Sequence, residues 1–308
     1  MIDILLSTYN GEKYLKEFLS SLVHQSCKNF KLIVRDDGST DTTNQILHDF
    51  VKKAPFPIVF CDNSGKHLGV VQSYAALLQE SSGEYVMFAD QDDIWYSDKV
   101  EKMMANMLEV EKKSQKTALL IHSDLSVCDA RGNLISSSFI KYQHLTPSRN
   151  NIFHLCVQNN VTGCAVMFNA HLKKLLRYPF PQEVICYDWY LALVAACFGK
   201  IVYIPNQYTY YRKHSSNVFG PQKYSVRSCI DHWRSGKKTL HDKLLAAQSQ
   251  TLNFVKQYND IIPDNTKSRL DIWGNINKFS KIRKLAISLR HGLRKNTFLR
   301  TLGMWWAL

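Results

Sequence analysis

The chain has 308 residues, enough for one large or two modest domains, and its 45% hydrophobic and 21% charged residues are typical of a globular protein. That composition excludes wholesale disorder and fibrous repeats. The net charge of +13 is unevenly spread: residues 221–308 hold 17 Lys and Arg against 5 Asp and Glu, whereas residues 1–220 hold 22 against 21. Such a basic region favours an anionic surface, either lipid headgroups or nucleic acid.

The eight cysteines form no Cys-x-x-Cys pair, so neither a zinc nor a redox motif is present. They lie mostly in apolar runs, and we expect buried free thiols in a reducing compartment. The start of the chain, MIDILLSTYN, lacks the basic stretch of a secretory signal. Because the longest apolar runs fall well short of the roughly 20 residues that span a bilayer, we expect a cytoplasmic protein whose contact with a membrane is peripheral.

The first 115 residues alternate between short apolar runs and segments with helical spacing. The runs predict strands at 2–6, 30–34, 58–61 and 85–89, and the helical spacing predicts helices at 14–23, 39–50 and 70–79. Ser39 or Thr40 is the expected cap of the second helix. This alternation predicts a parallel sheet with helices on both faces, whose ligands bind beyond the carboxyl ends of the strands.

The rest of the chain divides into a segment of mixed strands and helices and a segment of helices alone. Between 116 and 220 we expect strands at 118–127 and 200–204, the second closed by Pro205, and a helix at 184–198. Beyond 221 the pattern predicts several helices and no strand. The fold class is therefore α/β, with a domain over 1–220 (halves 1–115 and 116–220) and a basic α-helical region over 221–308.

An acidic run, Asp90-Gln91-Asp92-Asp93, directly follows the expected fourth strand. Carboxylates this close repel one another unless a cation neutralises them. Mg²⁺ and Mn²⁺ prefer oxygen ligands and are often held by one or two carboxylates plus substrate phosphates. The run therefore indicates a metal held against a diphosphate, and the alternative is a solvated acidic loop before a helix.

Two further polar segments follow strands at the same predicted edge. Residues 36–41, DDGSTD, offer carboxylates that can accept hydrogen bonds from a base or a ribose, or can simply cap a helix. Residues 7–11, STYNG, match neither the dinucleotide fingerprint nor the phosphate-binding loop of nucleotide hydrolases. This argues against those two classes of protein.

Taken together, STYNGEKYL, RDDGSTD and GEYVMFADQDDIW resemble family 2 glycosyltransferases of the GT-A fold, over about residues 1–220. ADQDDIW is similar to the rhamnosyltransferase-like subset of bacterial polysaccharide-assembly enzymes. Three later segments extend the resemblance: NNVTGCAVMFN at 159–169, YDWYLAL at 187–193 and YRKHSSN at 211–217.

The resemblance implies a role for each matching residue. Thr8, Tyr9 and Glu12 would line the nucleotide-base pocket, Asp37 would contact the pyrimidine and Asp90 would lie near the ribose. Asp92 would coordinate the metal, Mg²⁺ or Mn²⁺. His214 would be either a second metal ligand or a contact of the diphosphate. The loop under the sugar would be formed by Asn160, Thr162 and Gly163.

The resemblance also implies a catalytic base, because an acceptor hydroxyl must lose a proton as it attacks the anomeric carbon. Relatives often carry an acidic pair where this chain has Tyr187-Asp188, so we expect Asp188 to be the base, with a helix-capping charge as the alternative. Trp189 is a candidate platform for a sugar ring, or a core residue. No covalent nucleophile is needed for an inverting displacement.

Basic and apolar residues alternate near the end of the chain, in a pattern typical of an amphipathic helix at an anionic bilayer. The basic set is Lys278, Lys281, Arg283, Lys284, Arg290, Arg294, Lys295 and Arg300, and the apolar set is Ile282, Leu285, Ile287, Leu289, Leu293, Phe298, Leu299, Trp305 and Trp306. The alternatives are a solvated helical appendage and an oligomer contact. We expect no nucleic-acid partner, because no nucleic-acid-binding motif accompanies the charge.

The expected function is the transfer of a sugar from a nucleotide-sugar donor to a saccharide or lipid-linked saccharide acceptor in cell-surface polysaccharide synthesis. The ADQDDIW segment favours dTDP-L-rhamnose as the donor, and UDP-hexoses are the alternative on the same framework. Two other hypotheses stay open. One is a sugar nucleotidyltransferase, although the Gly-rich basic loop of that class is missing near the N-terminus. The other is a non-catalytic membrane-bound scaffold.

Overall fold

The computed structural model describes residues 1–61, 66–215, 217, 220–234 and 236–308. The chain forms two compact units. The first consists of Met1–Phe139, Val161–Phe180 and Gly199–Pro221, and the second of Ile140–Asn160, Pro181–Phe198 and Gln222–Leu308.

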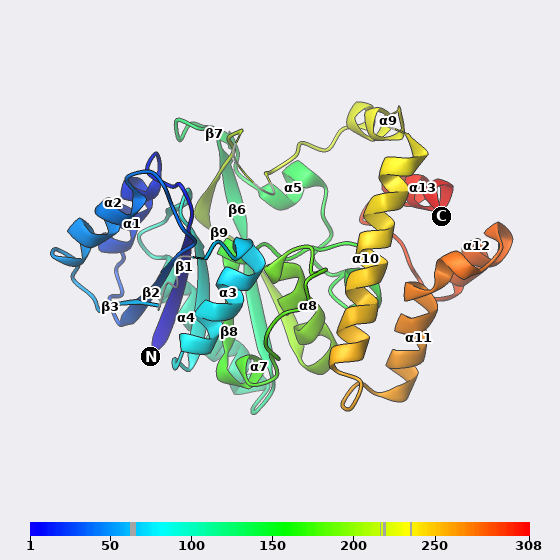
Figure 1. Cartoon of the computed structure of the whole chain (residues 1–308), viewed down its shortest axis with the longest axis horizontal. Coiled ribbons are helices and arrows are strands. Elements are labelled where there is room, and N and C mark those ends of the chain that lie inside the picture. Colours follow the sequence, from blue (N-terminus) through cyan, green and yellow to red (C-terminus); the bar gives the residue numbers. More distant parts are fainter. Residues whose placement is uncertain (62–65, 216, 218–219, 235) are drawn as a thin grey trace. The chain divides into compact units, whose positions relative to one another are not determined.

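A curled sheet, nine-stranded over the described residues, forms the centre of the first unit (Figure 1). Its strands are β1 (Ile2–Thr8), β2 (Phe30–Asp36), β3 (Ile58–Phe60), β4 (Tyr85–Asp90), β5 (Ile94–Trp95), β6 (Leu119–Cys128), β7 (Leu134–Ser136), β8 (Val166–Asn169) and β9 (Lys200–Arg212). They are ordered β3-β2-β1-β4-β8-β6-β9-β5, with β7 beside β6. The β3-β2-β1-β4 part is parallel, and β8 joins it to β6 by antiparallel pairing on both sides.

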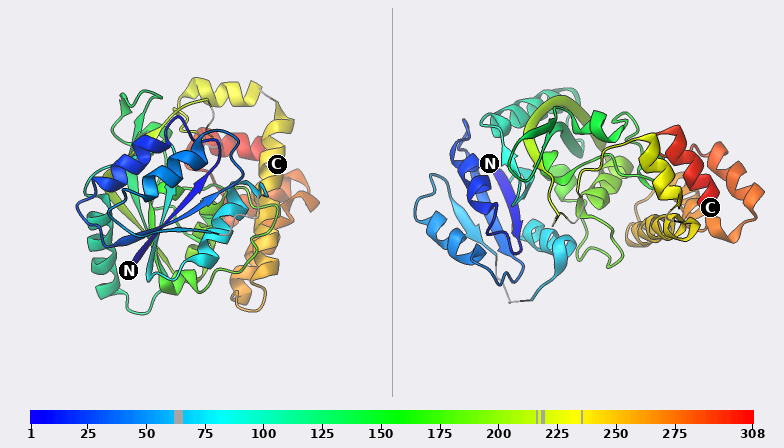
Figure 2. Two further views of the ribbon diagram at one scale, coloured as in Figure 1. Left: turned by 60° about the vertical axis from the view of Figure 1, so that its left-hand side comes forward. Right: turned by 90° about the horizontal axis from the view of Figure 1, so that it is seen from above.

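Helices cover both faces of this sheet (Figure 2), which confirms the predicted α/β class. They are α1 (Leu15–Val23), α2 (Thr43–Val51), α3 (Gly69–Glu80), α4 (Lys99–Lys113) and α7 (Ala170–Lys173), with a 3-10 turn at Gly163–Ala165. Ile4 of β1 shares one core with Phe18 of α1 and Met103 of α4. Tyr74 of α3 packs on the ring of Phe88 of β4, with ring centroids 5.0 Å apart. Alternate residues of a strand point to opposite faces, so β-strands rich in apolar residues can support both layers.

The last strand is longer than the sequence pattern predicts. β9 was expected to end before Pro205, but it continues to Arg212. The register with β6 shifts between Ser123 and Asp124, where Ile204 and Gln207 are the respective partners. Proline is tolerated in a strand at such an irregularity, because its missing N–H leaves no ladder bond broken. The prediction that the strand stops at Pro205 was therefore wrong.

The parallel register brings the ends of three strands together. Thr8, Asp36 and Asp90 are the last residues of β1, β2 and β4. Thr8 pairs with Asp36, and Ser7 beside it pairs with Asp90. The three polar segments selected from the sequence therefore meet at one edge of the sheet, as predicted.

The second unit is helical in its described residues. Its helices are α6 (Ile152–Leu155), α8 (Tyr187–Phe198), α9 (Val226–Arg234), α10 (Lys237–Gln257), α11 (Asp264–Gly274), α12 (Lys281–Arg290) and α13 (Phe298–Ala307), with a 3-10 turn at Ile276–Lys278; the short α5 (Phe139–Gln143) leads into this unit. Its core includes Trp273, Tyr190 and Phe254, all fully buried. None of the helices in the described part of the chain has both the length and the apolar character needed to cross a bilayer.

One buried histidine of β6 makes the stability of the first unit dependent on pH. His122 is 2% exposed, its Nε2 atom has no hydrogen-bond partner among the described residues, and burial lowers its pKa to about 4. An unfolded histidine takes up its proton near pH 6.5. Between these two values the unfolded chain binds more protons than the folded chain, so stability falls on acidification.

We therefore expect His122→Phe to remove part of the acid sensitivity. Between pH 7 and pH 5 the wild-type chain should lose about 2 kcal/mol more free energy of unfolding than the variant. Urea unfolding at both pH values measures this difference. Equal losses in the two proteins would contradict a neutral buried imidazole.

Candidate functional site

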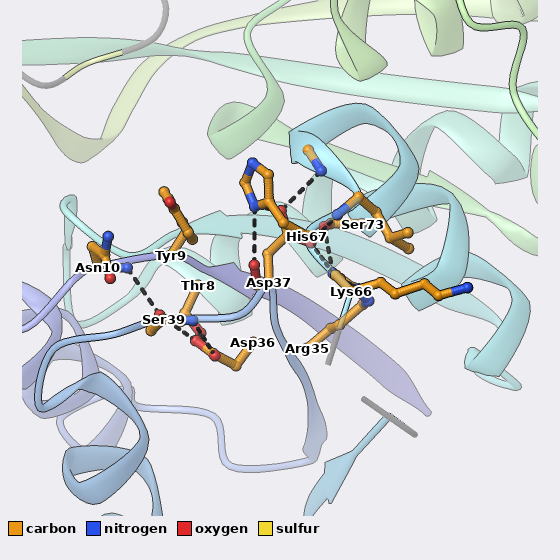
Figure 3. A network of polar contacts seen from close by, with 12 residues as sticks. Thr8, Tyr9, Asn10, Arg35, Asp36, Asp37, Ser39, Lys66, His67 and Ser73 are labelled. Atoms are coloured by element: carbon orange, nitrogen blue, oxygen red, sulfur yellow. Dashed lines mark hydrogen bonds and ion pairs between the residues drawn. The ribbon is translucent and has the colours of Figure 1, made fainter. Parts of the chain in front are cut away.

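Asp36 organises the loop that follows β2 (Figure 3). Its carboxylate accepts hydrogen bonds from the Thr8 hydroxyl at 2.8 Å and from the Ser39 backbone and hydroxyl at 2.8 and 2.6 Å. The Ser39 hydroxyl in turn accepts from the backbone N–H of Asn10 at 2.9 Å. Thr8 and Asp36 are both buried, so the Thr8 side chain ties β1 to β2.

Asp37 is turned inward and holds the loop before α3 (Figure 3). Its carboxylate accepts from the backbone of Leu68 and Gly69 at 2.7 and 2.9 Å, and it contacts Arg35 at 2.5 Å and His67 at 2.8 Å. Burial alone would raise the pKa of Asp37, but the hydrogen bonds, led by those from Leu68 and Arg35, outweigh it and lower the pKa. With 2% exposure, Asp37 stays ionised and positions His67.

Tyr9 forms the exposed rim of this edge. Its ring is 45% exposed and lies 4.5 Å, centroid to centroid, from the ring of His67. The Gln91 side chain fixes the Tyr9 backbone from the other side, accepting from its N–H at 3.0 Å and donating to its carbonyl at 2.9 Å. A Cβ atom on Gly11 would lie 2.1 Å from Gln91 Oε1, so this contact requires glycine.

Glu12 and Asp41 cap the start of α2. Glu12 accepts from the backbone and hydroxyl of Thr42 at 3.1 and 2.9 Å. Asp41 accepts from the backbone of Thr43, the first residue of the helix, at 3.0 Å, and from the Glu12 backbone at 3.1 Å. The expectation that Ser39 or Thr40 caps this helix was wrong, because the helix begins four residues after Ser39 and that hydroxyl is committed to Asp36.

Asp92 and His214, 122 residues apart in the chain, meet at the sheet edge. His214 Nε2 lies 2.7 Å from Asp92 Oδ2, and Asn217 donates to the same oxygen at 3.2 Å. The ring of Tyr14 stacks on His214 with centroids 4.8 Å apart. Of the motif at 211–217, Ser216 lies outside the described residues. The carboxylate remains 18% exposed, so it faces both the imidazole and solvent.

Arg212, at the end of β9, holds the acidic run from beneath. Its Nε donates to the Asp92 carbonyl at 2.8 Å, its Nη1 to the Ala130 carbonyl at 3.1 Å and its Nη2 to the Glu17 carboxylate. Its backbone N–H donates to Asp93 at 3.2 Å. The side chain is almost completely buried, so these contacts satisfy a guanidinium that water does not reach.

Two carboxylates of the run and one cysteine form a cluster of potential metal ligands. Single ligand atoms of Asp90, Asp93 and Cys164 lie within 4.8 Å of one another. Asp93 is fully buried and its Oδ2 atom has no hydrogen-bond partner among the described residues. Burial, reinforced by the charges of Asp92 and Asp90, raises the pKa of Asp93 well above its usual range.

The partly exposed carboxylates of the acidic run fit a hard divalent cation as their ligand. The thiol of Cys164 is fully buried, and burial raises its pKa well above the usual value, so it is a protonated neighbour rather than a ligand. Asp90 and Asp92 are only partly buried and present oxygen atoms, which Mg²⁺ and Mn²⁺ prefer. A cation there would also relieve the mutual repulsion of the carboxylates.

Buried Lys99 supports the floor of the site. Its ammonium donates to the Cys164 carbonyl at 2.6 Å and to the Thr209 hydroxyl at 2.8 Å, and it lies 3.6 Å from the ring centroid of Trp95. Burial lowers the pKa of Lys99 to about 8. This side chain links α4, β9 and the turn before β8.

Asp188 and Trp189 lie in the second unit, in the first turn of α8. Asn159 donates to Asp188 Oδ1 at 3.1 Å, and the carboxylate is 8% exposed. Trp189 is partly buried and donates from its indole nitrogen to the Leu155 carbonyl at 2.5 Å. Asp188 is thus a carboxylate with a fixed orientation at a helix N-terminus.

The three residues of the expected sugar loop differ in their surroundings. In the second unit, Asn160 is buried, donates to the carbonyls of Thr146 and Arg149 at 3.1 and 2.8 Å, and accepts from Asn296 at 2.6 Å. In the first unit, Gly163 begins the 3-10 turn and Thr162 precedes it, partly exposed. The amide of Asn160 thus joins the loop to the segment before α13.

Sequence reasoning missed four residues of the sheet edge: Tyr14, His67, Gln91 and Arg212. Gln91 lies within the acidic run, and Arg212 lies two residues before His214 in a segment that the motif had marked. His67 and Tyr14 carry no spacing signal, because their places depend on tertiary contacts with Asp37 and His214.

Comparison with known proteins gives a family for the chain. The model described as "Glycosyl transferase family 2" matches residues 3–175. An uncharacterized glycosyltransferase of Haemophilus influenzae is 29% identical over 58% of the chain, and the chain spans 66% of that relative, just under two thirds. A protein named dTDP-rhamnosyl transferase RfbG, of Shigella flexneri, is 24% identical over 70% of the chain and 73% of its own length.

Two solved structures share the fold. S. aureus TarS 1–349 in complex with UDP-GlcNAc aligns with a TM-score of 0.57 and 18% identity, covering 94% of this chain and 76% of that one. The Pyrobaculum calidifontis mannosyltransferase PcManGT, in complex with GDP-Man and Mn²⁺, aligns with a TM-score of 0.54 and 16% identity, covering 94% and 73%. This likeness shows the GT-A fold expected from the sequence.

The contact between Gly11 and Gln91 gives a testable prediction. Gln91→Ala should lower the free energy of unfolding by about 1–2 kcal/mol, because two hydrogen bonds to the Tyr9 backbone are lost. Gly11→Ala should displace the same side chain. The double variant should therefore cost clearly less than the sum of the two single variants, as measured by urea unfolding. Additive costs would show that Gly11 matters for another reason.

Proposed function

The chain belongs to glycosyl transferase family 2, and from this premise we propose that it is an inverting, metal-dependent glycosyltransferase. It moves a sugar from a nucleotide-sugar donor to a saccharide or lipid-linked saccharide in the assembly of a cell-surface polysaccharide. The observation that carries the proposal is the meeting of Asp92 and His214, at 2.7 Å, at the edge where β1, β2 and β4 end. Ligands of parallel α/β sheets bind at that edge.

Asp92 and His214 would hold the metal, Mg²⁺ or Mn²⁺. When bound, the metal neutralises negative charge on the departing nucleoside diphosphate. Asn217 and Arg212 keep the Asp92 carboxylate and its backbone in place. Tyr14, stacked on the imidazole, restricts the ring of His214.

The nucleotide is assigned to the edge formed by Thr8, Tyr9, Glu12, Asp37 and Asp90. Tyr9 offers an exposed ring for stacking on the base. Thr8 and Glu12 shape the pocket through their contacts with Asp36 and Thr42. We assign Asp37 to the base, where it would act by holding the loop before α3 and the His67 imidazole in place. We assign Asp90, which accepts from the Tyr74 hydroxyl at 3.0 Å, to the ribose.

The acceptor is assigned to Asp188 and its neighbours. Asp188 takes the proton of the acceptor hydroxyl as that oxygen attacks the anomeric carbon, and Asn159 orients the carboxylate for this step. Trp189 offers an aromatic surface for a sugar ring, and Asn160, Thr162 and Gly163 form the loop under the sugar. No covalent intermediate with the protein is required.

The proposed donor is dTDP-L-rhamnose, supported by the ADQDDIW segment and by the name of the Shigella relative. A UDP-hexose is the alternative, since one neighbour of the same fold holds UDP-GlcNAc. A panel of nucleotide sugars with Mn²⁺ in a thermal-shift assay separates them, because a ligand present at 100 times its Kd stabilises the folded state by about 2.7 kcal/mol.

The remaining assignments stay predictions. These are the catalytic domain over 1–220, the basic helical region over 221–308, the cytoplasmic location and peripheral contact with an anionic membrane.

A sugar nucleotidyltransferase would release pyrophosphate instead of a nucleoside diphosphate, so product analysis excludes one of these two functions. A non-catalytic scaffold would keep its cellular function in Asp92→Ala and Asp188→Asn.

The first test of the proposal is Asp92→Ala. We expect loss of Mn²⁺ binding, measured by calorimetry, and a decrease of at least about 100-fold in sugar transfer, because charge stabilisation at the leaving group is worth several kcal/mol. The matched control is Asp49→Ala, which removes an exposed carboxylate of α2. Full activity of Asp92→Ala in the presence of a chelator would refute the proposal.

The second test is Asp188→Asn. We expect transfer to fall by about 100-fold to 10,000-fold while donor binding is unchanged, because only proton transfer to the base is removed. Asp264→Asn, which also changes a carboxylate in the first turn of a helix, is the control for a helix-charge effect. If both variants lose only a little stability and keep their activity, Asp188 is a capping charge.

A further inference from the structure

Helix α12 presents an apolar stripe to solvent. Ile282, Leu285, Ala286 and Leu289 follow the i, i+3, i+4, i+7 spacing of one helix face, and all four are exposed. The exposed fractions of the three large side chains are 85% for Ile282, 41% for Leu285 and 61% for Leu289. Apolar side chains gathered on one exposed face mark an interaction surface, whereas single scattered ones do not.

The opposite face of α12 is the one that packs on the protein. Ser288 is buried and donates to the Lys284 carbonyl at 2.9 Å. Lys284 turns inward, where its ammonium donates to the Asn277 side chain at 3.4 Å and to the Leu308 carbonyl. The Ser288 hydrogen bond lies within the helix, whereas Lys284 ties α12 to Asn277 and Leu308, and the apolar stripe is left outward. Figure 1 shows it at the outer edge of the helical unit, beyond α11.

Cations flank the stripe on both sides. At 100° per residue, Lys281 lies on one side of the face centred on Ile282 and Leu289, and Arg283 and Arg290 lie on the other. All three are exposed, and none forms an ion pair in the described part of the chain. The arrangement is that of a helix lying in the plane of a membrane interface, where lipid phosphates meet the charges and acyl chains meet the stripe.

We infer that α12 is an interfacial membrane helix, which lies on a bilayer containing anionic lipid with Ile282, Leu285 and Leu289 among the acyl chains. This goes beyond the general membrane contact proposed above, because it assigns one face of one helix and does not depend on sugar transfer. Of the two terminal tryptophans, Trp305 is partly buried and Trp306 is 44% exposed. Helix α13 itself is packed through buried Met304 and Ala307, so it offers a single exposed tryptophan and no such stripe.

A second copy of the chain fits this face less well. Two such helices packed stripe to stripe would bring six cations close together with no carboxylate from α12 to neutralise them. Like charges placed together oppose association, whereas an anionic surface attracts all three cations of each helix. Charge complementarity therefore selects the bilayer.

The test is sedimentation of the full chain with vesicles of phosphatidylcholine and phosphatidylglycerol in equal parts, against vesicles of phosphatidylcholine alone. We expect binding to the anionic vesicles, reduced by about tenfold in Ile282→Asp and in Leu289→Asp, since each variant loses an apolar side chain that the bilayer would bury. The triple change of Lys281, Arg283 and Arg290 to Gln should reduce binding by about fivefold per charge, and only on anionic vesicles. The matched control is Leu134→Asp on β7, a leucine that is 59% exposed.

Each other outcome overturns the inference. If the wild-type chain stays in the supernatant, or if Ile282→Asp and Leu289→Asp bind as well as the control, α12 is not the membrane element. If light scattering shows a wild-type dimer that these two variants disrupt without any vesicle binding, the face is an interface between copies. Circular dichroism checks that the variants fold, and transfer to a soluble acceptor should be unchanged in all of them.

Discussion

The acidic edge of the sheet depends on one buried guanidinium. Arg212 reaches the Asp92 carbonyl, the Ala130 carbonyl and the Glu17 carboxylate, while its backbone N–H holds Asp93. A buried arginine is tolerated only when its donors are paired, so these partners must be in place together. The loop that carries Asp90–Asp93 thus has one conformation in which both the positive charge and the strand end are satisfied. The encounter of Asp92 with His214 follows from that conformation.

A second set of polar contacts positions the exposed ring of Tyr9. Tyr9, whose side chain is largely exposed, is held by the Gln91 amide on its backbone and by His67 at its ring. His67 in turn is held by Asp37. The exposed aromatic surface is therefore positioned by polar contacts, which keeps it available to a ligand without burying it in the core.

Much of the fold and of the site's location could be predicted from the sequence. Apolar runs closed by polar residues predicted strands at 2–6, 30–34 and 85–89, and in the structure these strands end one or two residues later, at Thr8, Asp36 and Asp90. Their meeting at one edge followed from parallel topology. The pairing of Asp92 with His214 came from motif resemblance, since no local pattern links residues so far apart. The sequence pattern could not say which way side chains turn: Asp37 and Asn160 are committed to internal partners.

Two expectations failed for a common physical reason. Ser39 is a good capping residue in isolation, and Pro205 is a good strand terminator. In the folded chain, the Ser39 hydroxyl is drawn to Asp36, and the register shift between β6 and β9 accommodates the proline. Local preferences of about 1 kcal/mol are overridden when several tertiary contacts compete with them.

The length of β9 has a consequence for how this protein can vary. The register with β6 shifts a second time between Asp124 and Ser126, and after that shift the strand keeps strict pairing, from Tyr210 opposite Ser126 to Arg212 opposite Cys128. Gain or loss of one residue in that stretch would swing the guanidinium to the other side of the sheet and leave the carboxylates unsupported. Insertions and deletions should therefore accumulate in the connecting loops and spare this strand, whatever sugar the protein has adapted to.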